Sequence, residues 1–396
     1  MTNRPDAGVS PRGATGFLPA LEGMRGFAAV GVLITHVAFQ TGAVHDPVIG
    51  RVWGRFDLAV ALFFALSGFL LWRPHAAAAR GYGVAQPTGR YLASRAVRIL
   101  PAYWTVVCLV LLLLPGAGGG WRVWVANLTL VQVFVPLTLT EGLTQMWSLS
   151  VEVAFYLVLP LLALALCRLR GDAARFRIPV ILAACALSLV WVWLPVATPE
   201  HIHHDNWLPG YLPWFGAGML LAELATLGGT WMHRLAARRG LMAAIAVGAF
   251  ALATTPLGGP EGLTDLEPWQ YNGKILLGAV MSAALLAPLT LAPRSDHRIL
   301  ASPAALAVGR WSYGIFIWHL AVLSIVFPVF GILPFHGHFW FVLAVTVVLS
   351  IAVASVSYAL VEEPARREFH RRTRAKRGDS GTVARPSATS PTTAAN

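Results

Sequence analysis

The chain has 396 residues, of which 56% are hydrophobic and only 12% are charged. Since roughly 25% of the residues in a soluble domain are charged, this composition excludes an ordinary soluble protein and indicates a chain that lies in a membrane. The net charge of +12 does not indicate nucleic acid as a partner, because the arginines lie between apolar runs and not on a basic helix with exposed aromatic residues.

Ten apolar segments of about the length needed to cross a bilayer follow one another along the chain. We therefore expect an all-α fold, a polytopic integral membrane bundle of about ten transmembrane helices. The expected spans are residues 18–39, 56–73, 99–115, 146–167, 178–197, 210–227, 241–257, 273–292, 304–330 and 339–361. The segment 121–139 is apolar but is interrupted by Asn127, Gln132 and Pro136, so we expect it to lie in the interface or to re-enter the membrane.

The distribution of Lys and Arg predicts the orientation of these spans. If the N-terminus is cytoplasmic, the segments on that side hold all but four of the 30 Lys and Arg residues. The four exceptions are Arg51, Arg55, Arg122 and Lys274. Because cationic loops are retained in the cytoplasm, this bias predicts cytoplasmic N- and C-termini in a multi-pass protein of the cell membrane.

Three segments differ in composition. Residues 1–16 lack the charged-then-apolar order of a secretory signal, and we expect a disordered N-terminal tail. Residues 17–367 hold all the spans and form one transmembrane domain. Residues 368–396 are first basic and then rich in Ser, Thr and Pro, so we expect a disordered C-terminal tail and no appended soluble domain.

The first span carries an arginine and a histidine at the two ends of the run RGFAAVGVLITH. Arg25 and His36 are eleven residues apart, which places them within about 20° of one helix face and about 16 Å apart along the axis. A snorkelling arginine and a core histidine would give the same pattern. The pair therefore predicts a function only together with other polar residues at membrane depth.

Glu152 and Tyr156 lie one turn apart in the fourth span, within QMWSLSVEVAFYLVLPLL. An unpaired carboxylate at this depth would cost several kcal/mol, so Glu152 needs a partner. Arg25, His36 and the arginines of residues 90–98 are the candidates. A structural ion pair between helices is the alternative to a catalytic role.

Arg95 and Arg98 are spaced at i, i+3 immediately before the third span, in RYLASRAVRILPAYW. On a helix this spacing lets both side chains bind one anion on the cytoplasmic side. A topology signal and a contact with lipid headgroups explain the two arginines equally well.

Ser67 and Gly68 interrupt the aromatic second span FFALSGFLLW. They allow either a close approach of another helix or a hydroxyl that faces a cavity. A nucleophilic serine would need an adjacent base, which this segment lacks. His319, in RWSYGIFIWHL, is a second histidine within a span, where a core position is equally compatible with the pattern.

We expect no metal centre and no disulfide framework. Cys108, Cys167 and Cys185 lie in or beside apolar runs without CxxC spacing. The histidines of residues 198–207 are typical of a solvated loop.

Together these motifs resemble those of the membrane-bound acyltransferase-3 family, whose members acylate hydroxyls of bacterial surface polysaccharides, lipid-linked sugars and antibiotics. LEGMRG followed by His36 resembles the first-span signature of an arginine and a histidine with ten residues between them. FFALSGFLL, RAVRILPAYW and WSLSVEVAFY resemble the motifs of the second, third and fourth spans. SYGIFIWH and YALVEEP resemble the closing motifs, so the resemblance covers residues 17–367.

Three positions depart from the family pattern. Glu22 stands where Asp is usual, which keeps the charge. Ala61 occupies a position often held by Asp, so the role of that carboxylate is lost or shifted to Asp57 one turn earlier. Val153 replaces a second Glu after Glu152, which concentrates the acid chemistry on one residue.

The resemblance implies an O-acyltransferase that uses acyl-CoA, with acetyl-CoA as the expected donor, and that has no bound cofactor. The implied acceptor is a hydroxyl of a glycan, a glycolipid or a secreted small molecule such as a macrolide. His36 is the expected general base, because an unperturbed pKa of ~6.5 is close to working pH, and Glu152 is expected to orient its ring. Arg25, Arg95 and Arg98 are expected to bind the phosphates of the donor.

The remaining candidates are expected to line the cavity. Ser67 and Trp147 are possible donors to the oxyanion, and Tyr156 and His319 possible lining residues. The second class of function is a transporter or flippase of a lipid-linked sugar, since intramembrane charges also mark translocation paths. That class predicts a repeat relating two halves of the chain, which we do not find. A non-catalytic sensor, the third class, would leave Arg25, His36 and Glu152 individually dispensable.

Overall fold

The computed structural model describes residues 16–260, 265–292 and 297–381. Within these ranges the chain forms helices and turns and no strand, so the predicted all-α class is confirmed. The helices are α1 (Pro19–Gln40), α2 (Gly50–Arg55), α3 (Ala59–Ala78), α4 (Thr88–Leu113), α5 (Trp121–Leu128), α6 (Trp147–Leu166), α7 (Arg177–Ser188), α8 (Leu208–Ala225), α9 (Trp231–Ala237), α10 (Arg239–Ala253), α11 (Pro268–Thr290), α12 (Pro303–Val329), α13 (Phe339–Ser357) and α14 (Glu363–Gly381). A π-helical turn, Tyr358–Glu362, joins α13 to α14.

Eight helical segments of the described part are long and apolar enough to cross a membrane. α9 and α10 form a further pair with a bend of 82° between them. α8 has 18 residues, includes Glu223 and is outside this set, although it packs against α3, α7 and α11. The count of about ten spans therefore stays a prediction, and so does the orientation of the termini in a membrane.

Two expected boundaries differ from the ends of the helices by more than ten residues. The third span was placed at 99–115, but α4 begins at Thr88 because the arginine-rich segment before residue 99 continues the same helix. Arginine is a good helix former, and its charge excludes it from a hydropathy window without ending a helix. At the C-terminus, α14 extends to Gly381, so the first part of the tail that was expected to be disordered is helical. Ion pairs at i, i+4, such as Arg372 with Glu368 at 2.6 Å, stabilise this helix.

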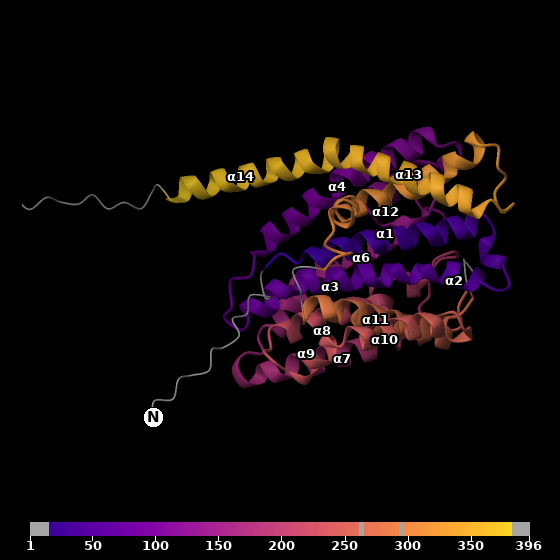
Figure 1. Cartoon of the computed structure of the whole chain (residues 1–396). Helices are drawn as coiled ribbons and strands as arrows, with labels where there is room; N and C mark the ends of the chain where they lie inside the picture. Colours follow the sequence, from indigo (N-terminus) through magenta and orange to yellow (C-terminus); the bar gives the residue numbers. More distant parts are fainter. Residues whose placement is uncertain (1–15, 261–264, 293–296, 382–396) are drawn as a thin grey trace, which may run out of the picture.

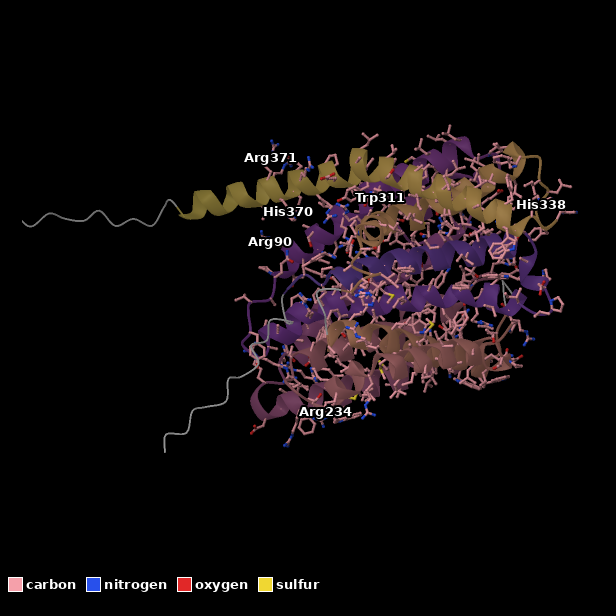
Figure 2. The ribbon with its side chains drawn as sticks, viewed as in Figure 1. Arg90, Arg234, Trp311, His338, His370 and Arg371 are labelled. Carbon is pink, nitrogen blue, oxygen red and sulfur yellow. The ribbon has the colours of Figure 1, made fainter. Side chains whose placement is uncertain are left out.

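α1 and α3 lie in the middle of the bundle (Figure 1). α1 packs against α12 and α3 packs against α8, while α11 and α10 extend the layer beyond α8 and α13 covers α12. Arg90, Arg234 and Arg371 lie at one end of the bundle and His338 at the other (Figure 2). The arginines of three separate segments therefore share one end, as the expected topology requires.

Glycines allow the close contacts of these central helices. A Cβ atom on Gly218 of α8 would overlap the carbonyl of Ala65 in α3, and a Cβ on Gly68 of α3 would overlap the carbonyl of Phe215 in α8. Between α1 and α12, a Cβ on Gly26 would lie 3.0 Å from the nitrogen of Gly309. Small residues let membrane helices approach until their backbones touch, and they set which side chains meet across the interface.

Replacing Gly218 with Ala is expected to destabilise the protein by about 1–3 kcal/mol, because α3 and α8 must separate to admit the methyl group. The matched control is Gly248→Ala on α10, where a Cβ has no neighbour within 4 Å. There the better helix propensity of Ala is expected to leave stability unchanged or to raise it. Thermal unfolding in one detergent measures both variants, and equal Tm values would contradict the close packing of α3 on α8.

From the last turn of α5 onward, amide side chains donate to backbone carbonyls of α5 and of the irregular segment that follows it. Asn127 is fully buried, and its amide donates to the carbonyls of Val123 at 2.9 Å and Thr138 at 2.8 Å. The amide of Gln132 donates to the carbonyl of Met146 at 3.0 Å. These hydrogen bonds explain how the polar interruptions of the apolar run 121–139 are tolerated next to the bundle.

Candidate active site

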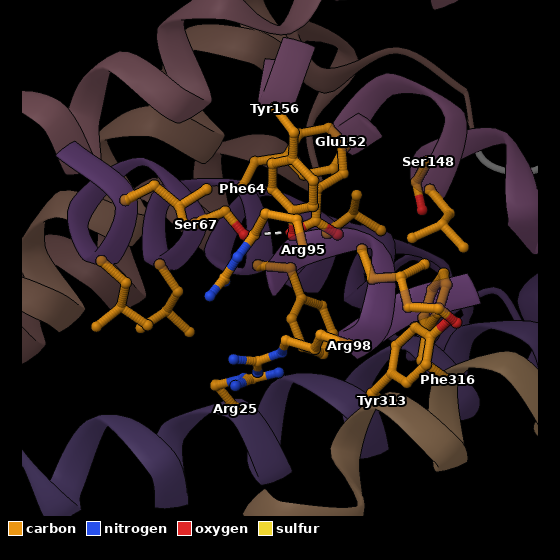
Figure 3. A pocket seen from close by; sticks show the side chains of 17 residues that line it. Arg25, Phe64, Ser67, Arg95, Arg98, Ser148, Glu152, Tyr156, Tyr313 and Phe316 are labelled. Atoms are coloured by element: carbon orange, nitrogen blue, oxygen red, sulfur yellow. Dashed lines mark hydrogen bonds between the residues drawn. The ribbon is translucent and has the colours of Figure 1, made fainter. Parts of the chain in front are cut away.

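A cavity of about 250 Å³ lies between α1, α3, α4, α6 and α12. Figure 3 shows its charged lining residues, with the guanidinium groups of Arg25, Arg95 and Arg98 directed into the open space. Six residues that sequence analysis singled out line this cavity: Arg25, Ser67, Arg95, Arg98, Glu152 and Tyr156. Residues from four separate helices are thus brought together as one polar site.

Three arginines give the cavity a positive character. Arg25 comes from α1, and its Nη1 lies 3.8 Å from Oε2 of Glu22, one turn earlier. Arg95 and Arg98 come from adjacent turns of α4, which is the arrangement that their spacing predicted. Nε of Arg95 is buried and has no hydrogen-bond partner in the described structure. Because such a donor is costly to leave unsatisfied, it favours a ligand that accepts a hydrogen bond here.

Glu152 is held by two hydroxyl groups. Ser67 of α3 donates to its Oε1, and the hydroxyl of Tyr156 donates to the same atom at 2.7 Å. These contacts differ from the expected contact between Glu152 and His36. In the described structure, Glu152 instead orients two hydroxyl groups of the cavity and offsets part of the arginine charge.

His36 lies outside the lining of the cavity and is paired with His319 of α12. Nδ1 of His36 is 2.8 Å from the carbonyl oxygen of Val32 and 3.2 Å from Nε2 of His319. The side chain of His319 is fully buried, whereas His36 is half-buried. The centres of the two rings are 5.0 Å apart. The parallel packing of α1 on α12 through Gly26 and Gly309 explains why the two rings meet at the same depth.

Phe316 connects the cavity to the histidine pair. It lines the cavity, and its ring centre is 6.0 Å from that of Phe63 on α3 and 6.0 Å from that of His319. One aromatic side chain, that of Phe316, therefore lies between the polar cavity and the imidazole of His319.

Two lining residues were not singled out from the sequence, and two expected ones, Trp147 and His319, are not part of the lining. Ser148 and Tyr313 line the cavity, and the hydroxyl of Tyr313 donates to the carbonyl of Ile99 at 2.9 Å. Both lie inside motifs that the sequence displays, WSLSVE and SYGIFIWH, so motif membership was the available signal. Trp147 is not among the lining residues and packs against Tyr211, with ring centres 5.2 Å apart.

Sequence analysis did not single out a buried ionic cluster around Glu223 of α8. The carboxylate is fully buried and accepts hydrogen bonds from Nε1 of Trp72 at 2.9 Å and Nη2 of Arg80 at 3.0 Å. Nη1 of the fully buried Arg177 lies 3.8 Å from Oε2 of Glu223. This cluster ties α3, α7 and α8 together and is separate from the cavity.

Asp57, which was considered as a substitute for a missing family carboxylate, is engaged elsewhere. Its Oδ2 lies 2.6 Å from Nζ of Lys274 on α11. The described residues contain no group of three or more His, Cys, Asp or Glu side chains that could hold a metal ion.

Sequence comparisons identify related proteins. The chain is 20% identical to the peptidoglycan O-acetyltransferase OatA of Listeria monocytogenes, over 89% of this chain and 56% of that protein. It is 24% identical to the putative peptidoglycan O-acetyltransferase YrhL of Bacillus subtilis, over 90% of this chain and 56% of that protein. It is 28% identical to the acyltransferase MdmB of Streptomyces mycarofaciens, over 77% of this chain and 79% of that protein.

The chain therefore spans just over half of the length of the two peptidoglycan enzymes. No solved structure matches it. The family model described as an acyltransferase domain matches residues 18–356. This range includes the whole cavity and both histidines, and the chain belongs to the acyltransferase-3 family.

Proposed function

We propose that this chain is an O-acyltransferase of the cell membrane that transfers an acyl group, acetyl in the simplest case, from acyl-CoA to a hydroxyl group. The observation that carries the proposal is the arginine-lined cavity between α1, α3, α4, α6 and α12. Three guanidinium groups and one carboxylate line the cavity, and the guanidinium groups remain in excess when Glu22, 3.8 Å from Arg25, is counted. The cavity therefore favours an anion over a neutral ligand. The diphosphate of CoA is such an anion.

The spacing of Arg25 and His36 supports the same donor. The two residues are eleven positions apart on one helix, which corresponds to about 16 Å along the axis. The pantetheine arm of CoA is long and unbranched, so a diphosphate bound by Arg25 leaves the thioester free to extend along α1 toward His36. Phe316 and Phe63 line the cavity, and Phe316 also contacts His319, so the two rings offer apolar surface to the acyl chain.

In the proposed reaction, the acceptor hydroxyl attacks the thioester carbonyl while His36 removes its proton. The carbon–sulfur bond then breaks, and the proton on His36 is returned to the leaving thiolate of CoA. General base catalysis of this kind contributes about 10²–10⁴ in rate. Glu152 contributes by orienting Ser67 and Tyr156 beside the bound donor.

The acceptor is proposed from the chemistry and from the relatives together. One relative is named a peptidoglycan O-acetyltransferase and another a putative one, which supports a sugar hydroxyl as the acceptor. A lipid-linked sugar and a secreted small molecule such as a macrolide present the same group.

The direct test is turnover by the purified protein in detergent. Peptidoglycan fragments, glycosides and macrolides are offered as acceptors, and thiol release from acetyl-CoA and from a longer acyl-CoA is measured. Mass spectrometry identifies the acylated product. Acylated product supports the proposal. Failure to bind CoA, together with passage of a lipid-linked sugar across vesicles without CoA, would favour a transporter instead.

Arg25→Lys is expected to weaken CoA binding by about ten- to a hundred-fold, because Lys cannot make the two parallel hydrogen bonds that a guanidinium makes to a phosphate. The matched control is Arg234→Lys, an exposed arginine of α9 at the same end of the bundle. Titration calorimetry with CoA measures both variants. An unchanged Kd for Arg25→Lys would contradict the anchoring role of Arg25.

A further inference from the structure

The contact between His36 and His319 restricts where the protons of the two rings lie. Nδ1 of His319 is 2.7 Å from the carbonyl oxygen of Phe316 and 3.2 Å from that of Ile315. Carbonyl oxygens only accept hydrogen bonds, so Nδ1 of His319 carries the proton. In a neutral ring, Nε2 of His319 is then unprotonated and presents its lone pair to His36.

His36 is the donor in this pair by the same reasoning. Its Nδ1 faces two acceptors, the carbonyl oxygen of Val32 at 2.8 Å and Nε2 of His319 at 3.2 Å. A proton on Nδ1 satisfies both, whereas a lone pair there would face two other lone pairs. Nε2 of a neutral His36 is therefore unprotonated, which is the form that a general base requires.

We propose that His319 is a positioning residue that holds His36 in this tautomer and in this ring orientation. The carbonyl of Val32 is on the same helix as His36. A hydrogen bond to this carbonyl alone would leave the imidazole ring free to rotate about the bonded Nδ1. His319 comes from α12, is fully buried and contacts the ring from a second direction. When His36 takes the proton of the acceptor, its positive charge is shared through Nδ1–H to the lone pair of His319.

This inference rests on the proposed role of His36, and one pair of variants separates a positioning role from a packing role. In His319→Gln, the side-chain oxygen can reach the place of Nε2 and accept from His36. In His319→Leu, the volume is similar but the acceptor is lost. We expect His319→Leu to lower kcat on the order of 10²-fold with little change in the KM for the donor, and His319→Gln to recover most of this loss.

The tautomer of His36 can be measured without any enzymatic turnover. The positioning role of His319 is therefore tested even if the protein does not catalyse the proposed reaction. Protein labelled with [15N]histidine is studied by NMR in detergent, and the His36 signals are identified by their loss in His36→Gln. Wild type and His319→Gln are expected to show His36 protonated on Nδ1 alone, whereas His319→Leu is expected to show a mixture of tautomers. The matched control is His45→Leu, an exposed histidine of the loop after α1.

Either of two results would overturn the proposal. One is a His36 signal in His319→Leu that is identical to wild type. The other is an equal loss of kcat in His319→Leu and His319→Gln, both folded to the same Tm as wild type, since a packing role does not distinguish an acceptor from its absence.

Discussion

Replacing His36 with Ala is expected to lower the kcat of acyl transfer by about 10²- to 10⁴-fold, the usual contribution of a general base. The affinity for CoA is expected to remain unchanged, because the arginines that bind the phosphates lie in the cavity and His36 lies beyond its lining. The structure also indicates that this variant folds. His36 is half-buried and the fully buried His319 keeps its own contacts with Phe316 and Ile315, so the helix packing survives the truncation.

The measurement combines single-turnover transfer with calorimetric titration of CoA for the same preparation. His336→Ala, in an exposed position after α12, is the matched control for removal of an imidazole. A folded His36→Ala protein that binds CoA and keeps the wild-type kcat would contradict the assignment of the base. Loss of CoA binding in that variant would instead indicate that His36 binds the donor.

The residues of the cavity were predictable because charge at membrane depth is costly. Arg25 and Glu152 stand out in apolar runs, and Arg95 and Arg98 directly precede one. Each needs a partner or a ligand to offset its desolvation. Their convergence on one cavity follows from that requirement. The helices themselves were predictable for the same physical reason, since a backbone without water satisfies its hydrogen bonds within a helix.

The partners of these residues were not predictable, because spacing along one helix says nothing about which helix lies beside it. Ser67 lacks a neighbouring base in its own segment, yet Glu152, 85 positions away, accepts its hydrogen bond. His36 was expected to meet Glu152, but its side-chain partner is His319, 283 positions away. Which helices meet is decided by glycine contacts such as Gly26 with Gly309, which single-sequence periodicity does not reveal.

Two of the arginines that contribute to the Lys and Arg bias also have a buried ionic partner, which the sequence did not reveal. Arg80 follows α3 and Arg177 begins α7, so both count as topology signals in loops. In the structure they contact Glu223, and Arg177 is fully buried. A charge at the end of a span can therefore mark the cytoplasmic side and neutralise a carboxylate of another helix at the same time.

Glu223→Leu is expected to be the most destabilising of the substitutions considered, by about 3–5 kcal/mol, because it leaves two arginines at a buried site without their shared carboxylate. Arg177 cannot move into water without separating α7 from its neighbours, since its side chain is fully buried. Nε1 of Trp72 also loses its acceptor. Glu223→Gln keeps an acceptor for Trp72 but removes the charge, so its effect is expected to be smaller.

Thermal unfolding in one detergent measures this difference against Glu200→Leu, whose carboxylate side chain is 90% exposed. The expected order of Tm is Glu200→Leu highest, then Glu223→Gln, then Glu223→Leu. Because Glu223 is outside the lining of the cavity, the folded fraction of each variant is expected to bind CoA with the wild-type Kd. A Tm of Glu223→Leu equal to that of Glu200→Leu would show that the cluster contributes nothing to stability. A weakened Kd in folded protein would show that α8 positions the arginines of the donor site through α3, its main packing partner.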